Sequence, residues 1–120
     1  MKTVKTMAAQ GDVLFRRVKS LPKNVKPMKA ERGEFVVAHS ETGHHHTVAA
    51  KGVEWFVNPQ DQLTSYLVLK PGTDGVDVVH HRAWDTHETL RLLNNTDGEV
   101  VYEIRRQREM TPEGWKRVED

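Results

Sequence analysis

Residues 99–107 read Glu-Val-Val-Tyr-Glu-Ile-Arg-Arg-Gln, and this stretch decides the fold class. Val100, Tyr102 and Ile104 share one face of an extended chain, and the residues between them share the other face. Alternation of this kind predicts a β-strand with one face in the core. The preceding residues 94–98, Asn-Asn-Thr-Asp-Gly, form a turn of the kind that closes β-hairpins. We therefore expect a sheet whose strands are connected by tight turns.

Extended segments recur along the chain between turn residues. We expect them at residues 13–15, 34–38, 44–50, 53–57, 63–69, 76–81 and 89–93. Strong turn signals separate them, above all the stretch Pro-Gly-Thr-Asp-Gly at 71–75. Strands spaced by turns every 8–12 residues or so predict a small all-β domain, either an antiparallel sandwich or a partly open barrel of about seven to nine strands.

The C-terminal end is predicted to be a short helix over residues 111–119. Thr111 is a favourable N-cap residue, and Pro112 suits the first helical position. Met110 and Trp115 stand at the positions of a hydrophobic staple on either side of this cap. We expect the helix to pack against the domain through Trp115.

The composition is that of one soluble domain of 120 residues, with 37% hydrophobic and 29% charged residues. Cysteine is absent, which excludes disulfides, thiolate-bound zinc and iron–sulfur clusters. Neither a secretory leader nor an apolar run of about 20 residues is evident. The expected location is the cytoplasm, or the host cytoplasm or virion for a phage-encoded protein.

The formal net charge of +1 conceals an uneven distribution. Residues 1–32 carry nine Lys or Arg against two acidic groups, while residues 33–120 carry nine basic and fifteen acidic groups. Such a split suits nucleic acid, an acidic partner or a neighbouring copy of the chain, although folding can also bring the two parts together. Residues 1–9 are expected to form an N-terminal tail ahead of the single domain.

All seven histidines lie between His39 and His87, and His44, His45 and His46 are consecutive. On a strand, His44 and His46 point to the same face, roughly 6–7 Å apart at the backbone. Two imidazoles in that arrangement can bind one zinc ion through bonds of about 2.0–2.1 Å. This pattern makes a divalent metal, with zinc as the first choice, the expected cofactor.

A second cluster, residues 80–88, offers further ligands. The preferred metal set is His44, His46 and His87, with His81 as an additional candidate. Glu88 or Glu41 is the expected carboxylate ligand or catalytic base. Three ligands and a water would make a hydrolytic centre, whereas four protein ligands would make a structural one. Two alternatives stay open: histidines that serve acid–base chemistry, phosphate contact or an interface, and histidines without a special role.

Four motifs resemble those of a group of small bacterial and phage proteins of unknown function. They are Gln-Gly-Asp-Val-Leu at 10–14, Thr-Gly-His-His-His at 42–46, Thr-His-Glu at 86–88 and Arg-Gln-Arg-Glu at 106–109. The resemblance covers most of residues 10–120 and implies that His44, His46, His87 and Glu88 belong to one site. It implies no particular activity.

Two functional hypotheses follow from the sequence. The first is a histidine-dependent metal site, with hydrolysis as its reaction. The second is a non-enzymatic interaction or assembly protein of phage origin, a homo-oligomer or part of a larger assembly, in which the basic N-terminal segment contacts a neighbour. Nucleic-acid binding ranks last, because the basic residues near 105–108 alternate between two faces and few aromatic residues accompany them.

Overall fold

The structure consists of β-strands joined by turns. The computed structural model describes residues 1–39, 45–81, 88–106, 108–111 and 114–117, and every regular element in them is a strand. The strands are β1 (Lys2–Val4), β2 (Met7–Gln10), β3 (Val13–Val18), β4 (Lys26–Pro27), β5 (Glu34–Ala38), β6 (His46–Ala49), β7 (Val53–Asn58), β8 (Asp61–Leu69), β9 (Gly75–His80), β10 (Leu90–Leu93), β11 (Val100–Arg106), β12 (Arg108–Thr111) and β13 (Gly114–Arg117).

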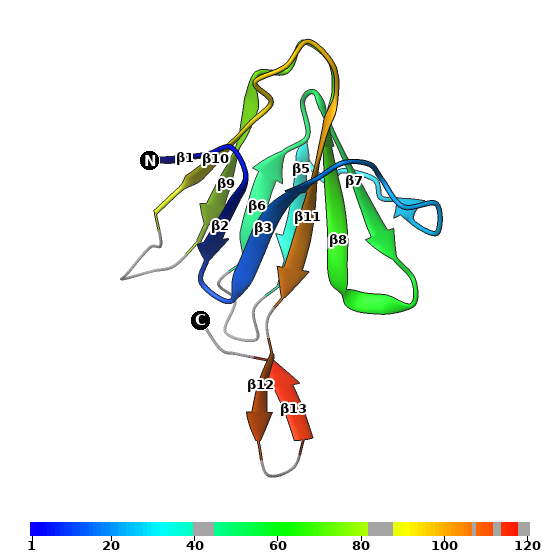
Figure 1. Ribbon diagram of the computed structural model, residues 1–120, viewed down its shortest axis with the longest axis vertical. Helices are drawn as coiled ribbons and strands as arrows, with labels where there is room; N and C mark the ends of the chain where they lie inside the picture. Colours follow the sequence, from blue (N-terminus) through cyan, green and yellow to red (C-terminus); the bar gives the residue numbers. More distant parts are fainter. Residues whose placement is uncertain (40–44, 82–87, 107, 112–113, 118–120) are drawn as a thin grey trace.

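The strands form two layers and a separate hairpin (Figure 1). Sheet A has the order β1-β10-β9-β6-β5, and sheet B has the order β2-β3-β11-β8-β7-β4. All neighbours are antiparallel except β1 and β10, which are parallel. The strand order shows two open sheets and no closed barrel among the described residues, so the all-β prediction is confirmed in its sandwich form.

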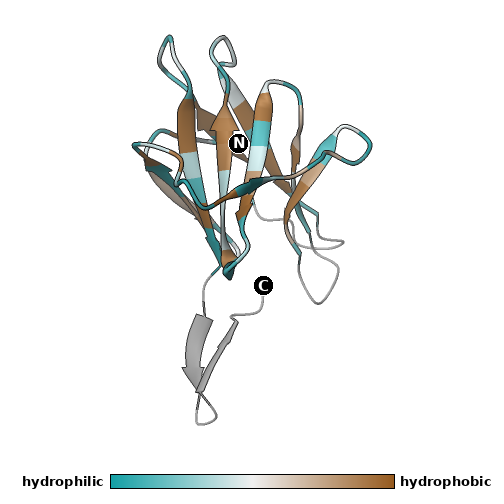
Figure 2. Cartoon of the chain, turned by 90° about the vertical axis from the view of Figure 1, so that its right-hand side faces the viewer, coloured by the Kyte–Doolittle hydropathy of each residue, from teal (hydrophilic) through white to brown (hydrophobic). Residues whose placement is uncertain are grey.

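The core lies between the two sheets, as the alternation of the strands predicts. Figure 2 shows apolar residues along the strands and hydrophilic residues in many of the turns. Val100, Tyr102 and Ile104 of β11 all belong to the main hydrophobic cluster, which confirms the predicted inner face of this strand. Across the core they meet residues of sheet A, among them Val48, Val78, Leu90 and Leu92. The strand predicted at 34–38 has the same bounds as β5.

The outer face of β11 is also buried. Val101 packs with Tyr66 and Val68 of β8, and the connection after β3 covers them with Leu21 and Val25. The Glu103 carboxylate lies on this face, where Arg16 Nη2 donates a hydrogen bond of 3.1 Å to its Oε1. Burial, together with this nearby negative charge, raises the pKa of the Tyr66 hydroxyl. β11 is therefore a central strand with both faces covered, which alternation alone did not indicate.

Residues 1–9, expected as a tail, contribute two strands. β1 pairs with β10 at the edge of sheet A, and β2 pairs with β3 at the edge of sheet B. The chain passes from one sheet to the other between Val4 and Met7, and the Thr6 carbonyl accepts a hydrogen bond of 2.7 Å from the Arg17 amide. Because this basic segment is built into the sandwich, an assembly role would use the surface of its strands rather than a free arm.

A hairpin occupies much of the region where the sequence predicts a helix over 111–119. β12 and β13 pair in antiparallel register, with Met110 opposite Trp115 and Thr111 opposite Gly114. The helix prediction is therefore wrong for the described residues. The local signals were ambiguous, because Pro followed two residues later by Gly fits positions i+1 and i+3 of a type I β-turn as well as a helix start. The hairpin projects from one end of the sandwich (Figure 1).

Two turns at the opposite end of the sandwich contact each other through Gly52. Its φ is +72°, and its carbonyl oxygen accepts a hydrogen bond of 2.9 Å from the Lys70 amide. A Cβ at this position would lie 2.1 Å from the Thr73 hydroxyl oxygen. Gly72 also has a positive φ, +87°, but a Cβ there would meet nothing within 4 Å.

We expect Gly52→Ala to lower the free energy of unfolding by about 2 kcal/mol, and Gly72→Ala by about 1 kcal/mol. Both substitutions place a Cβ in the left-handed region. Only Gly52→Ala adds a steric clash. Urea denaturation of the two variants measures the difference, and Gly52→Ala combined with Thr73→Ala should recover part of the extra loss. Equal losses in the two single variants would contradict the close packing of the turns.

Candidate functional site

Four polar side chains are buried together where one end of the sandwich closes. They are Gln10 at the end of β2, Asp12 in the following turn, His46 at the start of β6 and His80 at the end of β9, and each is at most 5% exposed. We call this set the buried polar cluster. Gln10 and Val13 are direct partners, so Gly11, with φ +61°, and Asp12 form a two-residue turn that brings Asp12 inward.

Gln10 connects the two sheets through its side-chain amide. Its Nε2 donates hydrogen bonds to the carbonyl oxygens of Val78 (2.9 Å) and Glu88 (3.0 Å). Carbonyl oxygens only accept, so the orientation of the amide is determined by its partners. Oε1 therefore faces Nδ1 of His46, 2.8 Å away, as an acceptor. It follows that His46 carries a proton on Nδ1.

The other ring nitrogen of His46 faces a carboxylate. Nε2 lies 4.0 Å from Oδ1 of Asp12, and both side chains are buried. The second oxygen of Asp12 lies 3.9 Å from Nη2 of Arg106, whose side chain is 11% exposed. Nη2 of Arg106 also donates a hydrogen bond to the carbonyl oxygen of His39. The Asp12 carboxylate thus lies between an imidazole and a guanidinium group.

His46 and His80 form a stacked pair. They are direct neighbours in the β6–β9 register, their ring centroids are 3.9 Å apart and their planes differ by 13°. Stacking uses the faces of the two rings and leaves the edges, which carry the nitrogens, for hydrogen bonds or ligands. The sheet therefore places two parallel imidazoles beside Gln10 and Asp12.

Of the residues predicted from the sequence, the structure places only His46 in this cluster. His81 follows His80 and lies on the opposite face of sheet A, where its Nε2 is 2.8 Å from the hydroxyl oxygen of Thr47. The carboxylate of Glu88 is exposed and pairs with the N-terminal amine at 3.6 Å. Glu88 contributes to the cluster only through its backbone carbonyl. The rings of His46 and His81 do not converge, because neighbouring residues of a strand point to opposite faces.

The remaining predicted residues lie outside the described part of the chain. They are His44, His87 and Glu41. Within the described ranges no three His, Asp or Glu side chains form a group ready to hold a metal ion. The same ranges contain no helix long and apolar enough to cross a membrane.

Sequence reasoning missed Gln10, Asp12 and His80 as site residues. A signal for His80 was present, since Val76 and Val78 alternate with it and both lie in the core. Gln10 carried no such signal, because its partners are distant by 36 to 78 positions in the sequence.

A family model for a domain of unknown function (DUF8820) matches residues 9–107. The chain belongs to the DUF8820 family. The DUF8820 match includes all four residues of the buried polar cluster and ends before the hairpin β12–β13. Searches of curated proteins and of solved structures find no match to this DUF8820 chain.

Proposed function

We propose that this protein binds one divalent metal ion, with zinc as the first choice, at the buried polar cluster, and that Nε2 of His46 is a ligand. The observation that carries this proposal is the 2.8 Å contact between Gln10 Oε1 and His46 Nδ1. Histidines that bind metal almost always donate the N–H of their other nitrogen to a carbonyl or carboxylate oxygen, which sets the tautomer. Gln10 has this role for His46.

Asp12 is the second proposed ligand. Its Oδ1 lies 4.0 Å from His46 Nε2, close to the sum of two zinc–ligand bonds of about 2.0–2.1 Å each. A movement of roughly half an ångström brings the two atoms to the separation of neighbouring ligands in a tetrahedral site. His46 would bind an ion through Nε2 at the edge of its ring and could keep its stacking with His80, which uses the face of the ring.

The sequence supplies the other proposed ligands, His44 and His87, both outside the described residues. Glu41, also outside them, is the proposed base, since the Glu88 carboxylate pairs with the N-terminal amine. A zinc ion with three protein ligands keeps a position for water and lowers the pKa of that water to about 7. The reaction class that we propose is therefore hydrolysis.

We expect the protein, prepared without an affinity tag, to bind one zinc ion per chain, and His46→Ala to weaken the binding by at least about 100-fold. His46→Ala removes a ligand outright, whereas substitution of a group that only orients a ligand lowers the metal affinity about 10–100-fold. Competition against a chromophoric chelator measures the affinity. Cobalt substitution adds a second readout, because visible absorption bands report the geometry of the bound ion.

His81→Ala is the matched control, since it removes a neighbouring imidazole on the other face of the same sheet. It should leave zinc affinity unchanged. If His46→Ala impairs folding, Asp12→Asn takes its place as the test variant. It keeps the shape of the side chain and should also weaken zinc binding. Substoichiometric zinc, or equal effects of His46→Ala and His81→Ala, would rule out this site.

A further inference from the structure

A pocket of about 300 Å³ opens on the side of the sandwich opposite β1 and β2. It lies between β5 of sheet A and β7 and β8 of sheet B, and the end of β11 lines its inner part. Val36, Val37, Val57, Leu63 and Ile104 make most of its wall apolar. Small-molecule sites are typically apolar concavities of this kind, about 300–1,000 Å³ in volume, with a few polar groups that orient the ligand.

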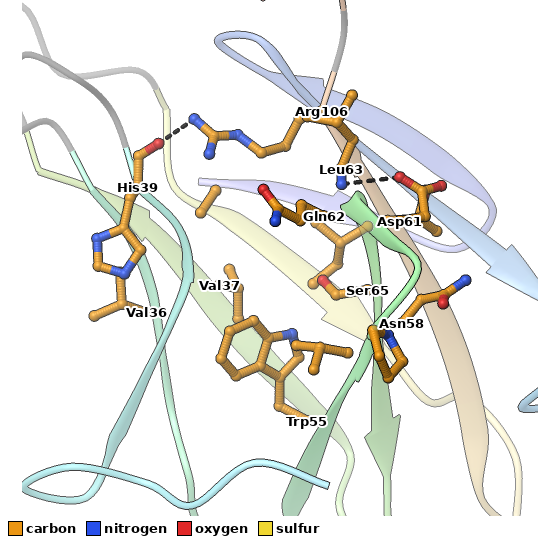
Figure 3. A pocket seen from close by; sticks show the side chains of 15 residues that line it. Val36, Val37, His39, Trp55, Asn58, Asp61, Gln62, Leu63, Ser65 and Arg106 are labelled. Carbon is orange, nitrogen blue, oxygen red and sulfur yellow. Dashed lines mark hydrogen bonds between the residues drawn. The ribbon is translucent and has the colours of Figure 1, made fainter. Parts of the chain in front are cut away.

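Trp55 supplies a hydrogen-bond donor in this wall. Its indole ring packs against Phe35, with ring centroids 6.0 Å apart, and its Nε1 is buried without an acceptor among the described residues. Figure 3 shows the ring between Val37 on one side and Ser65 and Asn58 on the other. A buried N–H group without a partner costs about 1–3 kcal/mol, and buried tryptophans usually have a partner.

The charged residues at the rim already have partners in the protein. Arg106 donates to the His39 carbonyl oxygen, and its guanidinium lies 3.9 Å from the Asp12 carboxylate. Asp61 accepts hydrogen bonds from the Leu63 amide (3.0 Å) and the Thr64 hydroxyl (2.8 Å). Among the described lining residues, both charged side chains are therefore already engaged within the protein. A neutral acceptor satisfies Trp55 without the cost of desolvating a charge.

We propose that this pocket binds a small neutral molecule with an apolar ring or branched aliphatic body and one carbonyl oxygen, which accepts a hydrogen bond from Nε1 of Trp55. This site is separate from the proposed metal site and does not depend on it. The apolar wall supplies affinity through buried surface, and the indole N–H supplies orientation and selectivity for the carbonyl.

The test uses three probes that share a phenyl ring: benzamide, benzoate and toluene. Each is titrated into the ¹⁵N-labelled protein, and Trp55→Phe identifies the Trp55 indole resonance among the three tryptophans. We expect benzamide to shift this resonance saturably at millimolar concentration and benzoate to bind several-fold more weakly. Followed through the backbone amide resonances, Trp55→Phe should weaken benzamide binding about fivefold to tenfold, the value of one hydrogen bond, and should not weaken toluene binding.

A pair of variants tests the location. Val57→Phe fills the pocket and should abolish the benzamide shift, whereas Val79→Phe, on the outer face of sheet A, should leave it unchanged. Three results would overturn the proposal: no saturable shift with benzamide, equal weakening of benzamide and toluene in Trp55→Phe, or a Trp55 resonance that moves with protein concentration alone. The last result would mean that another copy of the chain occupies the pocket.

Discussion

Gln10→Glu is expected to lower the free energy of unfolding by about 4 kcal/mol at pH 8. The substitution keeps the shape of the side chain but replaces the donor Nε2 by an oxygen, 2.9 and 3.0 Å from the carbonyl oxygens of Val78 and Glu88. The buried Val78 carbonyl and the partly buried Glu88 carbonyl then lose their donor and face a negative charge, and an uncompensated buried charge costs about 3–5 kcal/mol. Urea denaturation of both proteins measures the difference.

The loss should depend on pH in a defined direction. The new carboxyl group takes up a proton more readily in the folded state than in the unfolded state, because the proton allows it to donate to one of the two carbonyls. Its contribution to stability is therefore greatest below the unfolded pKa of about 4.3 and is lost as the pH rises. Relative to wild type, the variant should be less destabilised at pH 5 than at pH 8.

Gln60→Glu provides the control for Gln10→Glu, because it makes the same chemical change at a residue in an exposed turn. It should alter stability by less than about 0.5 kcal/mol. A loss for Gln10→Glu that is below 1 kcal/mol or so, or that is the same at pH 5 and pH 8, would show that the Gln10 amide does not have this orientation. The tautomer assigned to His46 would then be wrong, and the metal proposal would lose its main support.

Tyr102→Leu should cost about 4 kcal/mol. Tyr102 is fully buried between the sheets, and its hydroxyl donates toward the carbonyl oxygens of Leu93 (2.5 Å) and Val4 (3.2 Å). β11 of sheet B is thereby connected to the edge strand β1 of sheet A and to its neighbour β10. Replacing an aromatic ring in a core leaves a cavity and costs about 3–5 kcal/mol for the most severe changes. Tyr102→Phe, which removes only the hydroxyl, should cost about 2 kcal/mol.

Unfolding measurements at alkaline pH distinguish the contribution of the Tyr102 hydroxyl to stability from that of its ring. Burial is the largest cause of the raised pKa of Tyr102. Because the folded state holds this proton more tightly, the stabilisation is complete below the unfolded pKa of about 10 and is lost as the pH rises above it. Tyr102→Phe should therefore lose less stability than wild type above pH 10, while Tyr66, whose pKa is also raised, retains its own dependence. Identical alkaline profiles would contradict the buried hydroxyl.

The prediction for the C-terminal end shows the limit of local signals. Thr111 and Pro112 fit a helix start, and the same sequence stretch also fits a β-turn with Pro at its second position. A hairpin depends on pairing between Met110 and Trp115, and helix propensity does not weigh that pairing. The N-terminal strands β1 and β2 were missed for a related reason, since each is short and is held by a partner strand.

The sequence likewise indicated some parts of the candidate site and not others. The histidine-rich segments and the core face of β11 were evident from residue type and alternation. The choice of His80 over His81 as the neighbour of His46 needed the β6–β9 register, and the part played by Gln10 needed the contact between two sheets. Two assignments stay predictions: the role of His44, His46 and His87 as metal ligands, and the role of Glu41 as the catalytic base.

The amino-acid sequence by itself determined that this chain is an all-β domain, where eight of its strands lie, and which face of β11 enters the core. These properties follow from a period of two and from turn residues, which act over a few positions along the chain. The tertiary structure alone decided which strands are neighbours, how they divide between two sheets, and which polar side chains become buried together. Strand pairing joins residues far apart in the sequence, and its energy depends on how the whole core packs.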